Sequence, residues 1–263
     1  MSKVWVLNIF LLAMVVIALI FLIGRKDIKV GSPSEPPPIV KPSIEIVEQG
    51  ESVYGYTNDG ETVSGKSEHV YLTQAVTIYN PHDFPVTVGG VYNEVYDTAD
   101  TRIDSDEIQI IRTLAPGEVV QMAGNHYLSR LHFREDYGYS KIVTDVSKGF
   151  DSETPYTNLE TKNLSYHFKN ADPGNTFLQI EAIFANHSEQ NVDTTKVNFV
   201  IYFYDKTGKV IGGNTASSIT FQPERIKPGE EKRISFEGAL IGRTFSKNIA
   251  SVKVFAGCGN CRS

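Results

Sequence analysis

Cysteine and basic residues are scarce in this 263-residue sequence, and each shortage excludes a class of protein. Two cysteines cannot build a scaffold that is held together by disulfides. The 25 lysines and arginines are outnumbered by 31 aspartates and glutamates, which gives a formal net charge of −6. Because a nucleic-acid-binding protein needs a basic surface to neutralise phosphates, we expect no nucleic-acid partner.

Helical periodicity is also nearly missing. Beyond an apolar run near the N-terminus, no segment keeps an apolar stripe of helical period over three turns. Phenylalanine and tyrosine, by contrast, are plentiful, at 14 and 13 residues. Chains that are disordered throughout lack such apolar area, so the sequence predicts a folded, strand-rich protein.

The apolar run predicts a membrane anchor. Residues 4–23 read VWVLNIFLLAMVVIALIFLI, with no charge and a single polar side chain, Asn8. A helix of this length is about 30 Å long, the thickness of the hydrocarbon core of a bilayer. The run is longer than the apolar part of a secretory signal and ends without a small-x-small cleavage triplet. We predict a retained single-pass transmembrane helix, with its flanks, over residues 1–30.

The membrane side follows from two opposing arguments. Arg25, Lys26 and Lys29 outnumber the basic groups before the helix, and this alone favours a cytoplasmic C-terminal side. A very short N-terminal tail before a long anchor most often stays inside, however, and the strand-rich remainder is typical of an exported module. We predict a cytoplasmic N-terminus and extracytoplasmic β domains. Residues 31–42, GSPSEPPPIVKP, are predicted to form a proline-rich, extended linker between the transmembrane helix and the β domains.

The rest of the chain has the two-residue period of strands. Val70, Leu72, Val76 and Ile78 alternate with polar or aromatic residues and predict a half-buried strand. Residues 197–204 are apolar on both faces, which predicts a central strand. Turn sequences interrupt such runs about every ten residues. We therefore predict an all-β fold of two tandem β-sandwich domains, over residues 43–150 and 151–263.

An internal repeat supports two domains rather than one. Residues 96–103, YDTADTRI, match residues 204–211, YDKTGKVI, and each is followed by a Pro-Gly-Glu turn and preceded by an Asn-led polar turn. An aspartate at a strand end accepts backbone N–H groups two residues on, and Pro-Gly is the composition of a type II turn. The predicted structural turn residues are Tyr96, Asp97, Pro116, Gly117, Tyr204, Asp205, Gly208, Pro228 and Gly229.

These residues resemble a known domain family. The segment 182–236, with Asn186, the strand into Tyr204-Asp205 and the turn at 228–230, is similar to the FxLYD-type domain. That family is a small immunoglobulin-like β-sandwich on membrane-anchored or secreted bacterial and archaeal proteins. Residues 76–120 are similar but looser. The resemblance covers about half of the chain and implies an exported accessory or interaction module with immunoglobulin-like domains, without a catalytic residue.

One segment matches a nucleotide-binding pattern. Residues 60–67, GETVSGKS, place Gly60, Gly65, Lys66 and Ser67 at the fixed positions of a phosphate-binding loop. That loop needs a buried strand before it and a helix after it, whose N-terminus helps to hold the phosphate. A hairpin-type turn precedes the match and an alternating segment follows it. We interpret it as a hairpin tip, with a P-loop nucleotide-binding protein as the less favoured alternative.

Two further clusters have several possible interpretations. Cys258 and Cys261 form a C-x-x-C pair, which is a local disulfide or two free thiols, a metal or cofactor attachment, or a redox pair. Acidic residues gather on a predicted hairpin, where carboxylates serve solvation, Ca²⁺ binding or glycoside hydrolysis. They are Asp97, Asp100, Asp104, Asp106 and Glu107.

Exposed aromatic residues are the last candidates. Tyr54-Gly55-Tyr56 and Tyr137-Gly138-Tyr139 place tyrosines beside glycine on predicted loops, where the rings stack on sugars or anchor a protein partner. The sequence thus predicts a non-enzymatic, membrane-anchored interaction or accessory protein of the cell envelope, without a cofactor, that binds a protein partner. The alternative is a carbohydrate-binding or glycan-acting surface protein that uses these tyrosines or Asp104 and Asp106.

Overall fold

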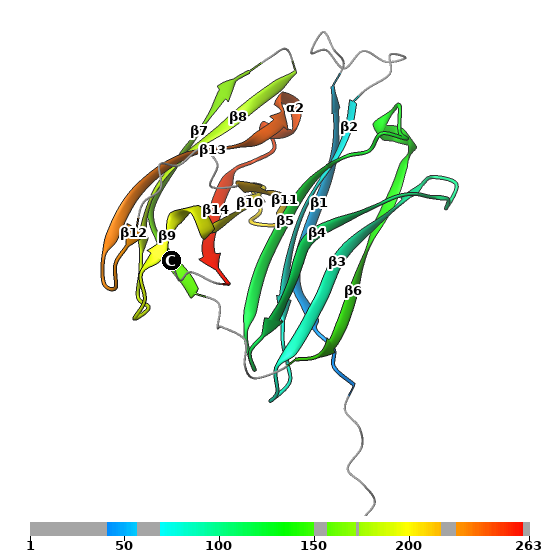
Figure 1. The fold of residues 1–263 in the computed structure, drawn as a ribbon. Coiled ribbons are helices and arrows are strands. Elements are labelled where there is room, and N and C mark those ends of the chain that lie inside the picture. The colour runs from blue at the N-terminus through cyan, green and yellow to red at the C-terminus, as the bar shows by residue number, and fades with distance from the viewer. Residues whose placement is uncertain (1–40, 57–68, 150–156, 172–173, 217–224, 260–263) are drawn as a thin grey trace, which may run out of the picture. The chain divides into compact units, whose positions relative to one another are not determined.

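The computed structural model describes residues 41–56, 69–149, 157–171, 174–216 and 225–259. From Pro42 onward they belong to one compact unit. Antiparallel strands make up nearly all of its regular structure, which confirms the all-β prediction (Figure 1). The helices in the described part of the chain are short: η1 (Arg134–Asp136), η2 (Thr194–Lys196) and α2 (Arg243–Ser246).

The predicted anchor and most of the linker lie outside the described residues, so both stay predictions. Within the described ranges, no helix has the length and apolar character needed to cross a bilayer. The predicted domain boundary near residue 150 also falls in an undescribed segment, 150–156, and the division into two domains stays a prediction.

Two three-stranded antiparallel sheets face each other over the first half of the described chain, and we call this part the first sandwich. One sheet has the order β1-β2-β5 and the other the order β4-β3-β6. The strands are β1 (Glu45–Tyr56), β2 (His69–Tyr79), β3 (Val86–Asp97), β4 (Arg102–Leu114), β5 (Val119–Tyr127) and β6 (Tyr137–Lys148).

The second half, which we call the second sandwich, has one folded-over sheet of six strands. Its order is β11-β10-β14-β7-β8-β13, and a short pair, β12-β9, is added. The start of β7 pairs with β14 and the rest of β7 pairs with β8, so β7 joins the two layers. The strands are β7 (Thr157–Asn170), β8 (Asn175–Ala185), β9 (Val192–Asp193), β10 (Asn198–Tyr204), β11 (Val210–Ala216), β12 (Arg225–Ile226), β13 (Glu231–Gly242) and β14 (Ser251–Cys258).

The two sandwiches have the same strand connectivity. The sheet β1-β2-β5 corresponds to β7-β8-β13, and β4-β3-β6 corresponds to β11-β10-β14. The two Asn-led turns give the register of this correspondence. Asn80 directly follows β2, the central strand of β1-β2-β5, and Asn186 directly follows β8, the central strand of β7-β8-β13. Both asparagine side chains are fully buried.

Each of these asparagines is bonded to a Pro-Gly-Glu turn in the same way. The N–H of Asn80 donates to the Glu118 carbonyl at 3.0 Å, and that of Asn186 donates to the Glu230 carbonyl at 3.0 Å. In both turns the glycine N–H returns a bond to the asparagine carbonyl. Each side-chain amide donates to the carbonyl four residues ahead and to a carbonyl just before the turn. A short polar sequence therefore closes both sandwiches at equivalent corners.

The Tyr-Asp turns also match. The carboxylate of Asp97 accepts N–H groups two and four residues ahead, and Asp205 does the same. The left-handed positions are Asp100, with φ of 62°, and Gly208, with φ of 81°. Aspartate and glycine tolerate this conformation, so both hairpins turn through equivalent residues.

The strand at residues 69–79 is more buried than the sequence predicts. Val70, Leu72 and Ile78 face the core of the first sandwich, as expected of a half-buried strand. Thr73 and Ala75, on the opposite face, are also fully buried, because that face packs against the second sandwich. The prediction of a half-buried strand was therefore wrong, because both faces are buried. The central-strand prediction for residues 197–204 agrees with β10, which pairs on both sides.

An apolar junction joins the two sandwiches. Figure 1 shows β10, β11 and β14 beside β1, β2 and β5. Small side chains of the first sandwich meet larger ones of the second; the buried cluster consists of Ala75, Ala123, Val200, Tyr202, Tyr204 and Val210. At the same junction the Thr77 and Tyr202 hydroxyls are hydrogen-bonded at 3.0 Å. Burial of the Tyr202 ring raises the pKa of its hydroxyl above its ordinary value.

Candidate binding surface

Four tyrosines line the end of the sheet β1-β2-β5 on one face, and we call them the tyrosine ladder. Tyr54 and Tyr56 come from β1, Tyr71 comes from β2 and Tyr127 comes from β5. The strand register places Tyr71 opposite both Tyr54 and Tyr127. Cross-strand neighbours on one face of a sheet are close enough for aromatic rings to touch, so the register builds the ladder.

Ring stacking makes the ladder continuous. The Tyr71 ring lies 5.6 Å from that of Tyr54 and 5.7 Å from that of Tyr56, with interplanar angles of 11° and 10°. Its centroid is 5.2 Å from that of Tyr127, at 41°. The hydroxyls of Tyr56 and Tyr71 are 3.4 Å apart. Such offset-stacked pairs stabilise each other beyond the area that they bury.

The inner end of the ladder is fixed by the second sandwich. Tyr54 is only 4% exposed and stacks on Phe245 of α2 at 5.3 Å and 8°. Its hydroxyl donates to Asn125 Oδ1 at 3.0 Å, and Asn125 Nδ2 donates to the Leu240 carbonyl at 3.2 Å. Burial raises the pKa of Tyr54, so the phenol keeps its proton and this bond at alkaline pH, where an exposed tyrosine ionises.

The outer end is open to solvent. Tyr127 is 48% exposed, and His69 lies beside it and beside Tyr56, at 5.9 and 5.4 Å between ring centroids. Partial burial, followed by the hydrogen bond with Tyr56, raises the pKa of Tyr71. A rigid row of rings with hydroxyls at its border offers large contact area at a low cost in side-chain entropy. The arrangement suits contact with a ligand through ring faces and hydroxyl groups.

The sequence found two of these tyrosines but misplaced them. Tyr54 and Tyr56 were predicted on a loop and lie within β1, and Tyr137 and Tyr139 lie within β6. The strands continue through Gly55 and Gly138, so glycine does not mark a loop at either place. The sequence missed Tyr71 and Tyr127, which reach the ladder only through strand register.

A second ring pair lies on the opposite sheet of the first sandwich. Tyr96 and Tyr139 stack at 4.7 Å and 9°. The Tyr139 hydroxyl donates to Asp100 Oδ1 at 2.5 Å, and the Tyr96 hydroxyl donates to Glu94 at 3.0 Å. The hydrogen bond to the Asp100 carboxylate raises the pKa of Tyr139 to about 12. Because both hydroxyls already donate to carboxylates, this pair is a weaker candidate than the tyrosine ladder for binding a ligand.

The P-loop match lies outside the described residues. Gly60, Gly65, Lys66 and Ser67 fall in the segment 57–68, between the end of β1 and the start of β2. The residues that flank this segment, Tyr56 and His69, are paired antiparallel neighbours. A strand therefore begins where a P-loop needs a helix. The nucleotide-binding alternative stays a prediction that the flanking strands do not favour.

The C-x-x-C pair is described only in part. Cys258 ends β14, is buried and is disulfide-bonded. Cys261 lies outside the described residues, so its pairing stays a prediction.

The acidic cluster separates into a turn and a strand. Asp97 and Asp100 form the hairpin turn, while Asp104, Asp106 and Glu107 lie on β4. Asp106 Oδ2 contacts His126 Nδ1 at 2.5 Å, so this carboxylate has a structural partner that the sequence did not reveal. In the described part of the chain, no three His, Cys, Asp or Glu side chains come together in a way that suits a metal ion.

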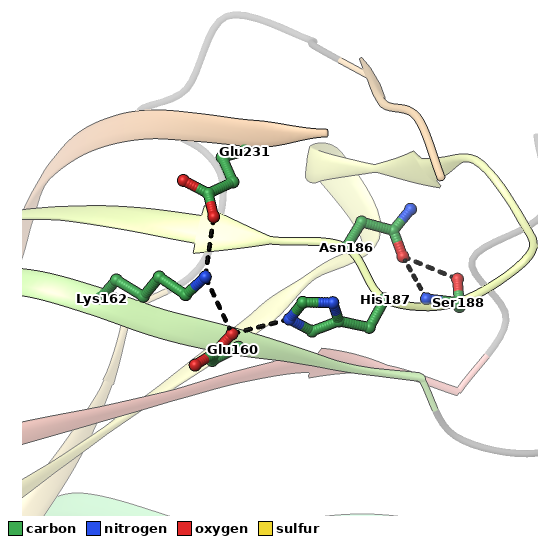
Figure 2. Close-up of polar contacts among 6 residues, drawn as sticks. All are labelled: Glu160, Lys162, Asn186, His187, Ser188 and Glu231. Carbon is green, nitrogen blue, oxygen red and sulfur yellow. Dashed lines mark hydrogen bonds and ion pairs between the residues drawn. The ribbon is translucent and has the colours of Figure 1, made fainter. Parts of the chain in front are cut away.

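A charged network covers one end of the second sandwich (Figure 2). Lys162 Nζ lies 2.7 Å from Glu231 and 3.2 Å from Glu160, and Glu160 also meets His187 Nε2 at 2.6 Å. Hydrogen bonds from His187 and then Lys162 lower the pKa of Glu160. Glu160, Glu231 and His187 are at least half exposed and Lys162 is 35% exposed, and ion pairs this open to solvent contribute little to stability. We interpret this network as a solvated surface.

Comparisons with known proteins assign no family. No protein-family model matches the chain, and no curated protein matches it. Among solved structures it is distantly similar to a β-glucuronidase of glycoside hydrolase family 2, at 15% identity over 70% of this chain and 21% of that one, with a TM-score of 0.23. A calcium-binding mutant of Bacteroides uniformis β-glucuronidase 2 matches at 8% identity over 76% and 28%, with a TM-score of 0.22.

The tandem CBM22 domains of Xyn10C from Paenibacillus barcinonensis match at 9% identity over 82% of this chain and 85% of theirs, with a TM-score of 0.16. The chain spans only 21% and 28% of the two β-glucuronidase chains. These likenesses concern a mostly β, sandwich-like fold alone, and TM-scores this low carry no argument about activity.

Proposed function

We propose that this chain is a non-enzymatic, membrane-anchored interaction protein of the cell envelope that binds a protein partner through the tyrosine ladder. The observation that carries the proposal is the open end of the ladder, where Tyr56 stacks on Tyr71, Tyr127 packs against Tyr71 at a tilt, and His69 lies beside Tyr127. Tyrosine is enriched at the energetic centres of protein interfaces because it buries a large area with few rotatable bonds.

The resemblance to FxLYD-type domains supports the same role, since that family implies exported accessory modules of immunoglobulin-like fold. The matching connectivity of the two sandwiches agrees with a duplicated domain of this kind. The 20-residue apolar run and the proline-rich linker would hold the pair of domains near, but off, the membrane.

The sheet edges are the weaker candidates for partner binding. An edge strand can add a strand from another protein, but natural edges are protected by bulges and charges. The register of β1 shifts between Ile46 and Glu48, and Glu45 and Glu51 add charge along this edge. The edge strand β13 also has a register shift, between Glu237 and Leu240. These features favour the ladder over the edges.

Site-specific photo-crosslinking tests the proposal. A photoreactive phenylalanine analogue is placed at Tyr127 in the full chain, expressed in intact cells of an organism that carries the gene, and the crosslinked proteins are identified. The matched control carries the analogue at Tyr139, which is 45% exposed and on the other sheet. We expect one envelope protein to crosslink from position 127 and not from 139. Equal crosslinking from both positions, or none from 127, would contradict the proposal.

Glycan binding is the second candidate, because nearly parallel stacked rings with hydroxyls at their border also suit a sugar chain. A glycan array probed with the full chain in detergent distinguishes the two. Binding that the Tyr127→Ala variant loses and the Tyr139→Ala variant keeps would assign the ladder to a glycan.

A further inference from the structure

A layer of polar side chains crosses the core of the first sandwich, and each of its six strands contributes one. We call it the polar layer; it consists of Glu51 on β1, Gln74 on β2, Asn93 on β3, Asp106 on β4, His126 on β5 and Ser140 on β6. It lies between two separate apolar clusters. One contains Val76 and Met122, and the other contains Leu72 and Leu128. The strand positions between these clusters are the ones that carry the polar residues.

Hydrogen bonds close the layer at both edges of the sandwich. At the edge formed by β4 and β5, His126 Nδ1 contacts Asp106 Oδ2 at 2.5 Å. Toward the edge formed by β1 and β6, Gln74 Nε2 donates to Glu51 Oε2 at 2.9 Å and to Ser140 Oγ at 2.7 Å. Ser140 Oγ also donates to Glu51. The two facing sheets are thus joined by polar contacts on either side of the core.

The middle of the layer contains polar atoms without a partner. Asn93 is fully buried, and neither its Nδ2 nor its Oδ1 has a hydrogen-bond partner among the described residues. The same holds for Gln74 Oε1 and His126 Nε2, in side chains that are 1% and 9% exposed. Buried polar groups in folded proteins are nearly always bonded, either to protein or to ordered water.

The chemistry of these atoms specifies what they need. An imidazole that donates Nδ1–H to the Asp106 carboxylate leaves Nε2 as an acceptor. Gln74 Oε1 is a second acceptor, and Asn93 offers both a donor and an acceptor. The three acceptors need three donated hydrogen bonds, and the Asn93 amide needs an acceptor. A single water donates only two hydrogen bonds, so at least two water molecules are required to satisfy the layer.

A hollow beside the polar layer gives it an entrance. Gly124 lies opposite Gln74 in the strand register, and the absence of a side chain there makes room for the His126 ring, since a Cβ at Gly124 would lie 2.6 Å from His126 Nε2. A hollow of about 480 Å³ opens at the seam between β1 and β6, and Glu51, Gln74 and Ser140 are among the residues that line it. Gln74, with Glu51 and Ser140, therefore connects the polar layer to a space that solvent can enter, whereas Asn93 and His126 lie deeper and are not among the residues that line it.

We propose that the polar layer is a buried hydration site, in which ordered water molecules bridge Asn93, Gln74 Oε1 and His126 Nε2. Buried waters of this kind make about three hydrogen bonds to otherwise unsatisfied groups and are part of the fold. The site joins the two sheets through Asn93 of the central strand β3, whose side chain has no direct hydrogen-bond partner among the described residues.

A crystal structure of the full chain at about 1.5 Å resolution or better is the direct test. We expect density for water within hydrogen-bond distance of Asn93 and of at least one of Gln74 Oε1 and His126 Nε2. A dry layer, or rotated side chains that bond each other directly, would overturn the proposal. This measurement uses the unchanged protein, so it does not depend on the folding of a variant.

The Asn93→Leu variant gives a second test through the sign of its effect. If water bridges the layer, leucine displaces it and leaves Gln74 Oε1 and His126 Nε2 unpaired, so the melting temperature falls by about 3 °C or more. If the Asn93 amide has no water partner, leucine removes two unsatisfied groups at similar volume and the melting temperature rises, which refutes the site. The control, Asn248→Leu, replaces an exposed asparagine and leaves the melting temperature nearly unchanged.

Discussion

Thr73 and Gly213 exchange two hydrogen bonds across the buried junction of the sandwiches. Thr73 Oγ1 donates to the Gly213 carbonyl at 2.6 Å and accepts from the Gly213 N–H at 3.0 Å. One hydroxyl therefore satisfies both backbone groups of a residue 140 positions away. The two groups have no access to water, so this pair joins the sandwiches with a specificity that apolar contact alone does not supply.

The Thr73→Val variant tests this relationship. Valine keeps the shape but leaves the Gly213 N–H and carbonyl buried without partners, so we expect a loss of about 2–4 kcal/mol in the free energy of unfolding. Urea denaturation followed by circular dichroism measures it. The control is Thr98→Val, at an exposed turn, with a change within about 0.5 kcal/mol. Equal stabilities of the two variants would contradict the role of the hydroxyl.

Gly213 also permits the close approach of the sheets. A Cβ atom there would lie 2.5 Å from the Ile201 carbonyl oxygen, 2.8 Å from the Ala123 Cβ and 3.0 Å from the Ala75 Cβ. We expect Gly213→Ala to separate the layers and to cost about 1–3 kcal/mol of unfolding free energy, as overpacking does. Urea titration measures this too, and an unchanged midpoint would show that the junction adjusts without cost.

The equivalent asparagines predict matched losses. Asn80→Ala and Asn186→Ala each leave buried carbonyls and an N–H group unpaired, so each variant is expected to lose about 2–4 kcal/mol. Asn248→Ala, in an exposed position, is the control. Calorimetric unfolding of the three variants compares them. A large loss for one corner and none for the other would refute the structural equivalence of the two turns.

Alkaline pH is expected to weaken the fold through its tyrosines. The pKa of Tyr139 is raised by its bond to Asp100, and that of Tyr204 is raised by burial and by nearby Glu48, both to about 12 from an ordinary 10.0. The unfolded chain loses these protons first, so stability is fully present below pH 10.0 and falls as the pH rises towards 12.

Tyrosinate absorbance during an alkaline titration checks this. We expect Asp100→Asn to move the titration of Tyr139 to lower pH, because the carboxylate that disfavours the tyrosinate is gone. Asp104→Asn is the control: it neutralises a carboxylate that accepts the backbone N–H of Ser105, and we expect it to leave the curve in place. A titration curve that Asp100→Asn does not change would contradict the assignment.

Local signals in the sequence predicted local structure well. Each Tyr-Asp and Pro-Gly-Glu turn is closed by a hydrogen bond between residues three positions apart, such as Gly208 N–H to the Asp205 carbonyl and Glu230 N–H to the Lys227 carbonyl, so the local sequence specifies the turn. The alternation around Leu72 predicted a strand for the same reason. The all-β fold follows from many such segments.

Features that depend on distant contacts could not be predicted in this way. The second buried face of β2 exists because Gly213 and its neighbours cover it, and nothing in residues 69–79 encodes that partner. The ladder requires Tyr71 and Tyr127 to meet through register, and each is an ordinary strand tyrosine in the sequence. The polar layer could not be predicted for the same reason. Asn93 and His126 are single polar residues in separate strands, and only the folded structure brings them into one layer.

The junction has one more consequence, for assembly. It joins the β1-β2-β5 face of one sandwich to the β11-β10-β14 face of the other, a head-to-tail contact that, repeated between molecules, would grow into an open fibre. In the second sandwich, the sheet β7-β8-β13 corresponds to β1-β2-β5. When positions are counted back from Asn186 and from Asn80, Gln179 and Glu181 on this sheet correspond to Thr73 and Ala75. Glu181 pairs there with Arg233 of the next strand. This ion pair puts charged groups where the junction has Ala75, so we expect the stack to end after two units, much as polar terminal repeats end a solenoid.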